Sequence, residues 1–183
     1  ITQNVDSDDS IWKLTKARLP WLLLALVGSF VAVNISQSFS NAMNLYPQLF
    51  FFTPLVAAMA GNVGVQSSAI IVQGLANNNI TGSIWKRLGK EMLLALSNST
   101  LLAGILLIAT HFLMSTSYEI SSTIVLALVI VMILASLIGT SIPIMLSKYG
   151  VDPAIATGPF ITTSNDIFGL LIYFSIAKMI LGF

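Results

Sequence analysis

Five long apolar stretches, separated by short polar connections, constrain the fold of this chain more than any other feature. They cover Leu19 to Ser38, Pro47 to Ala76, Met92 to Met114, Ile120 to Leu146 and Ile155 to Leu181. An α-helix needs about 20 predominantly apolar residues to cross the roughly 30 Å hydrocarbon core of a membrane. Because each stretch is that long and only 8% of the residues are charged, the sequence predicts an all-α integral membrane protein with five transmembrane helices.

The positions of the basic residues predict how the helices are oriented. Basic side chains precede the first stretch, separate the second from the third and follow the fourth: Lys13, Lys16, Arg18, Lys86, Arg87, Lys90 and Lys148. The connections 37–46 and 115–119 contain no Lys or Arg. Because cytoplasmic loops are enriched in basic residues, we expect a cytoplasmic N-terminus, a C-terminus outside, and a multi-pass protein of the cell inner (plasma) membrane.

The chain reads as one membrane domain. We expect residues 1–17 to form a cytoplasmic juxtamembrane segment and residues 18–183 to form a five-helix ion-conducting domain, since no linker, low-complexity tract or repeat divides them. The first apolar stretch is longer than the core of a signal peptide. The chain begins without Met, and we expect a soluble part to precede it in a longer protein. Cysteine is absent, which excludes disulfides and thiolate metal sites.

Asp166 lies about halfway along the fifth stretch, where a membrane-spanning helix would hold it far from water. A charged aspartate at a helix centre costs roughly 2.5 to 3.5 kcal/mol, and such residues usually face the interior of a bundle or a water-filled path. Thr162 lies four residues earlier, on the same helical face. Oxygen ligands without imidazole or thiolate suit Mg²⁺, Ca²⁺ or Mn²⁺ better than zinc or copper, so the segment predicts an ion route.

The second stretch is unusually polar for a lipid-facing helix. Pro54 interrupts it, and the run from Gly61 to Ser68 includes Asn62 and Gln66, which lie four residues apart on one face. We expect a broken or kinked helix here, since irregular backbone at membrane depth is tolerated where it is buried in protein or lines water. The fifth stretch predicts a comparable break over residues 152–159. A tight, glycine-mediated helix crossing is the alternative for Gly61 and Gly64.

These segments together resemble the transmembrane domain of MgtE-type magnesium transporters. The resemblance rests on six groups of residues: Pro54 with Gly61-Asn62, Gly64 and Gln66; Asp152-Pro153-Ala154; Gly158-Pro159; Asn165-Asp166 before Gly169-Leu170-Leu171-Ile172-Tyr173; Arg18-Leu19-Pro20-Trp21; and Lys90-Glu91. It covers the chain from Lys16 onward. It implies a homodimer with one ion pathway at the two-fold interface, lined by the second and fifth helices, with Mg²⁺ as the transported and pore-bound ion.

The resemblance also implies roles for individual residues. The carboxylates of Asp166 from both protomers would bind a largely hydrated Mg²⁺, and Asp152 would lie at the cytoplasmic mouth. The full set of candidate metal-site residues is Asp166, Asn62, Gly61, Thr162, Asp152, Asn165 and Gln66. Val65, Ala69 and Gly158 stand where a relative has polar side chains, which puts the selectivity among divalent ions in question. The family also implies cytoplasmic regulatory domains upstream.

The predicted function is channel-like conduction of hydrated Mg²⁺. The alternatives are a Na⁺-coupled or less selective carrier of Mn²⁺, Co²⁺ or Ca²⁺, and a non-transporting membrane anchor subunit. A membrane enzyme would need a second titratable group at the depth of Asp166, and the sequence has none, so we expect no enzyme. We expect a second copy of the chain, membrane lipid and divalent cations as partners, and no nucleic acid. Glu91, at the start of the third stretch, is expected to have a structural role.

Overall fold

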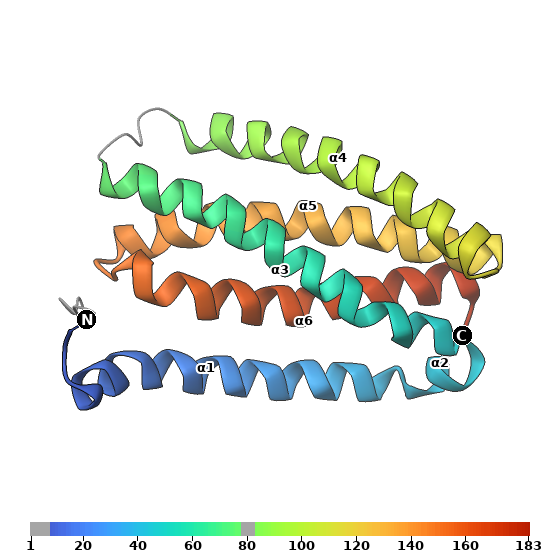
Figure 1. Ribbon diagram of the computed structural model, residues 1–183, viewed down its shortest axis with the longest axis horizontal. Helices are drawn as coiled ribbons and strands as arrows, with labels where there is room; N and C mark the ends of the chain where they lie inside the picture. Colours follow the sequence, from blue (N-terminus) through green and yellow to red (C-terminus); the bar gives the residue numbers. More distant parts are fainter. Residues whose placement is uncertain (1–7, 78–82) are drawn as a thin grey trace.

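The computed structural model describes residues 8–77 and 83–183, and in these ranges the regular structure is entirely helical. The helices are α1 (Ile11–Ser38), α2 (Ser40–Leu45), α3 (Pro47–Ala76), α4 (Ile84–Ile108), the π-helical turn η1 (Ala109–Leu113), α5 (Tyr118–Lys148) and α6 (Pro153–Leu181) (Figure 1). Among the described residues, five helices are long and apolar enough to cross a membrane: α1, α3, α4 continued by η1, α5 and α6. The predicted all-α, five-helix fold is therefore confirmed.

Two of the helices begin eight residues before the apolar stretches predicted for them. α1 begins at Ile11 rather than Leu19, because the Ser10 hydroxyl caps it by accepting a hydrogen bond from the Lys13 amide (3.4 Å). Lys13 also forms a salt bridge with Asp9 (2.7 Å). The described part of the expected juxtamembrane segment is thus largely helical, whereas residues 1–7 lie outside the described residues. α4 likewise begins eight residues before the predicted Met92, at Ile84.

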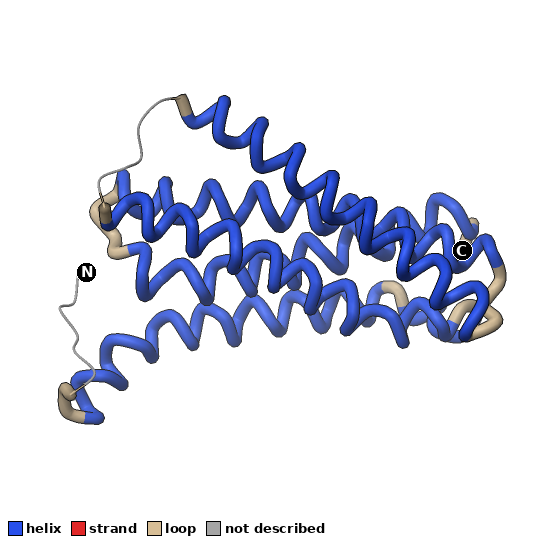
Figure 2. The backbone as a smooth tube through the Cα atoms, turned by 45° about the horizontal axis from the view of Figure 1, so that its top comes forward, coloured by secondary structure: helices blue, strands red, loops and turns tan. Residues whose placement is uncertain are grey.

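α5 lies at the centre of the bundle and α1 at its edge. α5 packs against α3, α4 and α6. In its most apolar 18-residue segment 56% of the residues are buried, compared with 11% in that of α1. α6 lies between α1 and α3, and α4 diverges from the bundle toward its Ile84 end (Figures 1 and 2). The start of α1 and the end of α6 lie at opposite ends of the bundle (Figure 1). α1, α4 and α6 begin at the same end of the bundle. All of the Lys and Arg residues except Lys178 lie toward this end, which we call the basic end.

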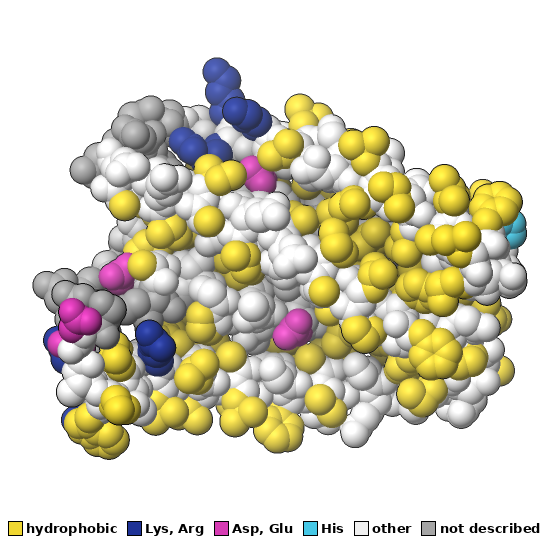
Figure 3. All heavy atoms as spheres, in the orientation of Figure 1, with side chains coloured by type: hydrophobic (Ala, Val, Ile, Leu, Met, Phe, Trp, Pro, Cys, Tyr) yellow, Lys and Arg dark blue, Asp and Glu magenta, His cyan; other side chains and the backbone are white. Residues whose placement is uncertain are grey.

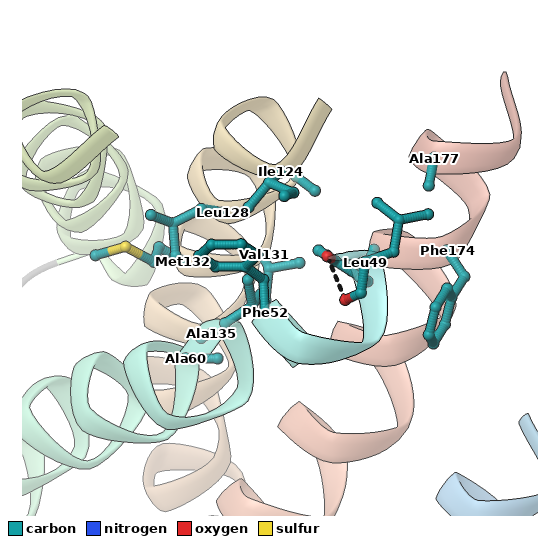
Figure 4. Close-up of a cluster of buried hydrophobic side chains, with 13 residues drawn as sticks. Leu49, Phe52, Ala60, Ile124, Leu128, Val131, Met132, Ala135, Phe174 and Ala177 are labelled. Atoms are coloured by element: carbon teal, nitrogen blue, oxygen red, sulfur yellow. Dashed lines mark hydrogen bonds between the residues drawn. The ribbon is translucent and has the colours of Figure 1, made fainter. Parts of the chain in front are cut away.

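The main hydrophobic core joins α3, α5 and α6 in the half of the bundle away from the basic end (Figure 4). Phe52, Leu128 and Phe174 are among its buried members. The hydroxyl of Tyr173, a residue that is 1% exposed, donates a 2.7 Å hydrogen bond to the Leu49 carbonyl oxygen. This contact and the apolar packing hold the first half of α3 against α6.

The predicted breaks in the second and fifth spans are wrong. α3 is continuous through Pro54 and the polar run that follows, and α6 begins at Pro153 and continues through Pro159. A proline removes one backbone donor, but a bilayer offers no water to the further groups that an opened helix would expose. Pro54 leaves only the Phe50 carbonyl oxygen, four residues earlier, without its backbone donor. Losing one backbone hydrogen bond therefore costs less than opening the helix.

Candidate ion site on α3 and α6

Asp166 lies near the middle of α6 and is half-buried. Among the described residues its carboxylate has no hydrogen-bond or ion-pair partner. On the face of the molecule in Figure 3, charged side chains gather toward the basic end, and an isolated acidic group lies near the middle among hydrophobic and uncharged side chains. A charged carboxylate at this depth without a protein partner is costly, and contact with water or a cation would offset that cost.

The contact between α3 and α6 brings the two candidate segments together. Asn165, which is 3% exposed, donates a 3.2 Å hydrogen bond from Nδ2 to the Ala60 carbonyl oxygen. At Gly64 the helices are so close that an added Cβ would lie 2.6 Å from Asn165 Nδ2 and 2.8 Å from Ile161 Cγ2. Gly139 of α5 meets the same place, because its Cβ would lie 2.3 Å from the Gly64 carbonyl oxygen. Gly64 is therefore a packing glycine at the meeting point of three helices.

Gly61 differs from Gly64, since a Cβ added there would meet nothing within 4 Å. It leaves the α3 backbone open to approach, and Asn62 and Gln66 are exposed one turn apart on this helix. Thr162 of α6 is also exposed, and its hydroxyl donates to the carbonyl oxygens of Gly158 (3.1 Å) and Pro159 (3.2 Å). The hydroxyl oxygen keeps its lone pairs for another donor or for a cation.

The structure separates Asp152 from the rest of the candidate set. Its Oδ1 accepts a hydrogen bond from the Ala154 amide (2.9 Å) and caps α6 at the basic end. Asp152 and Asp166 are 14 positions apart on one helix, which corresponds to about 21 Å along the axis at 1.5 Å per residue. One chain therefore offers a mid-helix group around Asp166 and, well removed from it, a carboxylate at the end of the bundle.

Two hollows flank Asp166 along α6. A cavity of about 340 Å³ lies between α1 and α6 near the basic end and is lined by residues including Arg18 and Pro159. A second, of about 430 Å³, lies beyond Asp166 among α1, α2, α3 and α6, with Phe50 and Leu170 in its wall. Between α1 and α6 the contact is close, since a Cβ at Gly28 would lie 1.9 Å from Thr163 Cγ2.

A three-helix contact formed by Glu91 was only partly expected from the sequence. Its Oε1 accepts hydrogen bonds from the hydroxyls of Ser67 of α3 (2.5 Å) and Ser136 of α5 (2.7 Å). The carboxylate thereby ties α4 to its two neighbours, which agrees with the expected structural role. Ser67 and Ser136, two polar residues within apolar stretches, were the only sequence indication of this contact. The sequence spacing does not show that both of them reach Glu91.

Among the described residues no group of three or more His, Cys, Asp or Glu side chains could hold a metal ion. A cation near Asp166 would therefore meet one carboxylate and several neutral oxygens per chain. Such a sparse set suits an ion that keeps much of its hydration shell, as Mg²⁺ commonly does. Among the described residues, five membrane-capable helices define an integral membrane domain, and it carries a mid-helix carboxylate beside exposed amide side chains.

Comparison with known proteins identifies the kind of transporter. Residues 53–176 match the profile of the MgtE family, described as divalent cation transporters. Since this match covers more than half of the chain, the chain belongs to the MgtE family. It is a multi-pass protein of the plasma membrane and a member of a family of transporters, not of enzymes, as predicted.

Three curated relatives are similar over nearly the whole chain. The magnesium transporter MgtE of Bacillus subtilis is 35% identical over 180 residues, which is 96% of this chain and 39% of the relative. Those of Thermus thermophilus and Enterococcus faecalis are 32% and 30% identical, over 90% and 93% of this chain and 36% and 38% of theirs. The chain therefore spans less than two fifths of the length of these relatives.

Proposed function

We propose that this chain is the ion-conducting part of a Mg²⁺ transporter, in which hydrated Mg²⁺ crosses the membrane along α3 and α6. The observation that carries the proposal is the Asp166 carboxylate, half-buried at mid-helix without a partner among the described residues. The exposed Asn62, Gln66 and Thr162, together with the open backbone at Gly61, would supply neutral oxygens nearby.

Two copies of the chain would form one pathway. A single carboxylate leaves a divalent ion with a net positive charge in a poorly solvated place, whereas two symmetry-related copies of Asp166 would balance it. The surface of α6 that lies between α1 and α3 (Figure 1) is the surface on which a second copy would place its own α6. In this arrangement the carboxylates contact water of the hydration shell, and Asp152 from each copy gathers cations at one mouth.

The membrane potential would drive the ion inward. Moving one elementary charge through 100 mV is worth about 2.3 kcal/mol, so a divalent ion gains about twice that amount. A passive channel needs no second substrate under these conditions. We further propose a cytoplasmic N-terminus, in keeping with the basic end, and regulatory domains in the longer protein, since the relatives extend well beyond the region that this chain matches.

A less selective divalent cation transporter is the second candidate. Val65, which is 48% exposed, lies between Asn62 and Gln66, and Ala69 is exposed one turn later. Apolar side chains at these places reduce the number of oxygens that distinguish Mg²⁺ from Mn²⁺, Co²⁺ or Ca²⁺. A Na⁺-coupled carrier would use the same surface, and an anchor subunit would leave the Asp166 carboxylate without a use.

Flux through proteoliposomes tests the proposal. We expect the purified protein to carry Mg²⁺ in response to an imposed voltage alone, and Asp166→Ala to abolish this flux while the protein still inserts and elutes at the same oligomeric size. Parallel assays with Mn²⁺, Co²⁺ and Ca²⁺ separate the selective from the unselective candidate. Strict dependence on a Na⁺ gradient would replace the channel by a coupled carrier, and undiminished flux in Asp166→Ala would remove Asp166 from the pathway.

A further inference from the structure

The interhelical hydrogen bond of Asn165 joins the immediate neighbours of the candidate ion residues. Asn165 precedes Asp166 on α6, and Ala60, whose carbonyl oxygen accepts from Asn165 Nδ2 at 3.2 Å, precedes Gly61 and Asn62 on α3. A bond between these two positions sets the distance between the Asp166 carboxylate and the oxygens of α3. We infer that Asn165 is a positioning residue for the ion site and that a buried water completes its hydrogen bonding. This inference rests on the proposed function.

The burial of Asn165 shows why it acts through its neighbour. With 3% of its surface exposed and its Nδ2 already committed to Ala60, the side chain offers no face to a hydrated cation that passes along the exposed surfaces of α3 and α6. It lies instead against Gly64, where an added Cβ would come within 2.6 Å of Nδ2. The amide therefore reaches the α3 backbone only because residue 64 has no side chain.

The side-chain oxygen of Asn165, Oδ1, indicates a bound water. Asn165 Oδ1 is buried and has no hydrogen-bond partner among the described residues. Asn165 also lines a cavity of about 10 Å³ together with Thr53, Tyr173 and Gly169. This is close to the smallest volume that holds one water molecule, and a buried water needs two or more polar partners. A buried acceptor without a donor destabilises the protein. A water in this cavity would supply the donor that Asn165 Oδ1 lacks.

The hydroxyls that share the cavity can accept but not donate. The Thr53 hydroxyl donates to the Leu49 carbonyl oxygen at 3.0 Å, and the Tyr173 hydroxyl donates to the same oxygen at 2.7 Å. Each hydroxyl has one hydrogen, so both are in use. A water would therefore donate one hydrogen to Asn165 Oδ1 and the other to one of these hydroxyl oxygens. The water would link α6 to α3 a second time, beside the Ala60 contact.

Replacement of Asn165 by leucine tests the positioning role, because leucine keeps the branched shape and removes the hydrogen bonds. If the productive spacing of α3 and α6 becomes less populated, the apparent affinity falls by the same factor. We expect Asn165→Leu to raise the half-saturating Mg²⁺ concentration by about 3- to 18-fold, the range that interhelical hydrogen bonds in membranes provide. The double variant Thr53→Val/Tyr173→Phe, which removes both hydroxyl acceptors open to the water, should shift it in the same direction.

The matched control is Asn34→Leu. Asn34 is exposed on α1, and its Nδ2 donates to the Phe30 carbonyl oxygen of its own helix at 2.7 Å, so its replacement removes an amide but no interhelical bond. A fall in maximal flux with unchanged half-saturation in Asn165→Leu would mean only lost folded protein and would overturn the positioning role. An unchanged half-saturation in the double variant Thr53→Val/Tyr173→Phe would overturn the water. Failure of the proposed function is distinguishable, since it appears as unchanged flux in Asp166→Ala.

Discussion

Gly139→Ala offers the most direct test of how α3 and α5 are packed. The Cβ that this change adds would lie 2.3 Å from the carbonyl oxygen of Gly64 and 2.9 Å from its carbonyl carbon and its Cα. Ordinary contacts of a Cβ begin near 3.4 Å, so the helices must separate by about 1 Å at this place. All three atoms belong to the backbone, and no side chain can rotate away to make room.

The expected magnitude follows from two opposing contributions. Adding a methyl group to a tightly packed site costs roughly 1 to 3 kcal/mol, and backbone neighbours favour the upper part of that range. Alanine in place of glycine within a helix returns about 0.5 to 1 kcal/mol. We therefore expect Gly139→Ala to lower the stability by about 1 to 2 kcal/mol and to reduce Mg²⁺ flux, since α3 would carry one side of the proposed ion pathway.

Thermal unfolding in detergent, followed by the amount of protein that keeps its elution position, measures this change. Gly104→Ala on α4 is the matched control, because a Cβ at Gly104 meets nothing within 4 Å. The control keeps only the helix-forming benefit, so its midpoint should equal or exceed that of the parent. If Gly139→Ala were as stable as Gly104→Ala, the close approach of α3 and α5 would not exist in the folded protein.

Two further substitutions test contacts that hold the helices together. Glu91→Ala leaves the Ser67 and Ser136 hydroxyls without their acceptor and should lower the stability by about 1 to 3 kcal/mol. The control Glu119→Ala, in the first turn of α5, should change the stability by less than about 0.5 kcal/mol. Equal thermal midpoints for the two variants would refute the three-helix contact. Tyr173→Phe removes a single hydrogen bond to α3 and should cost about 0.6 to 1.7 kcal/mol, while the same change at Tyr118, which is 65% exposed, should cost nothing measurable by the same assay.

The sequence predicted the helices well because lipid exposure depends mainly on composition. The second span was placed at Pro47 to Ala76, where α3 lies. The starts of α1 and α4 were missed, since polar residues outside the hydrocarbon can continue a helix without appearing in a hydropathy pattern. The breaks at Pro54 and over residues 152–159 were predicted wrongly, because proline preferences measured in water neglect how costly an open backbone is in lipid.

The individual site residues were harder to assign, because their roles depend on which helix each of them faces. Gly61 and Gly64 were equal candidates for packing in the sequence, but Gly64 lies against α5 and α6 while Gly61 faces open space. Asn165 was predicted as a metal ligand together with Asp166. Neighbouring positions on a helix point about 100° apart, and the buried position of Asn165 became visible only once α3 was placed beside it.

The contacts on either side of Asp166 limit how α6 can move. Thr163 fits against Gly28 of α1 with no room for a methyl group between them, and Asn165 is bonded to Ala60 of α3. Turning α6 about its own axis would break one attachment and force the other into its neighbour. If ions follow the proposed pathway along this surface, its opening and closing would carry α1, α3 and α6 together as one block.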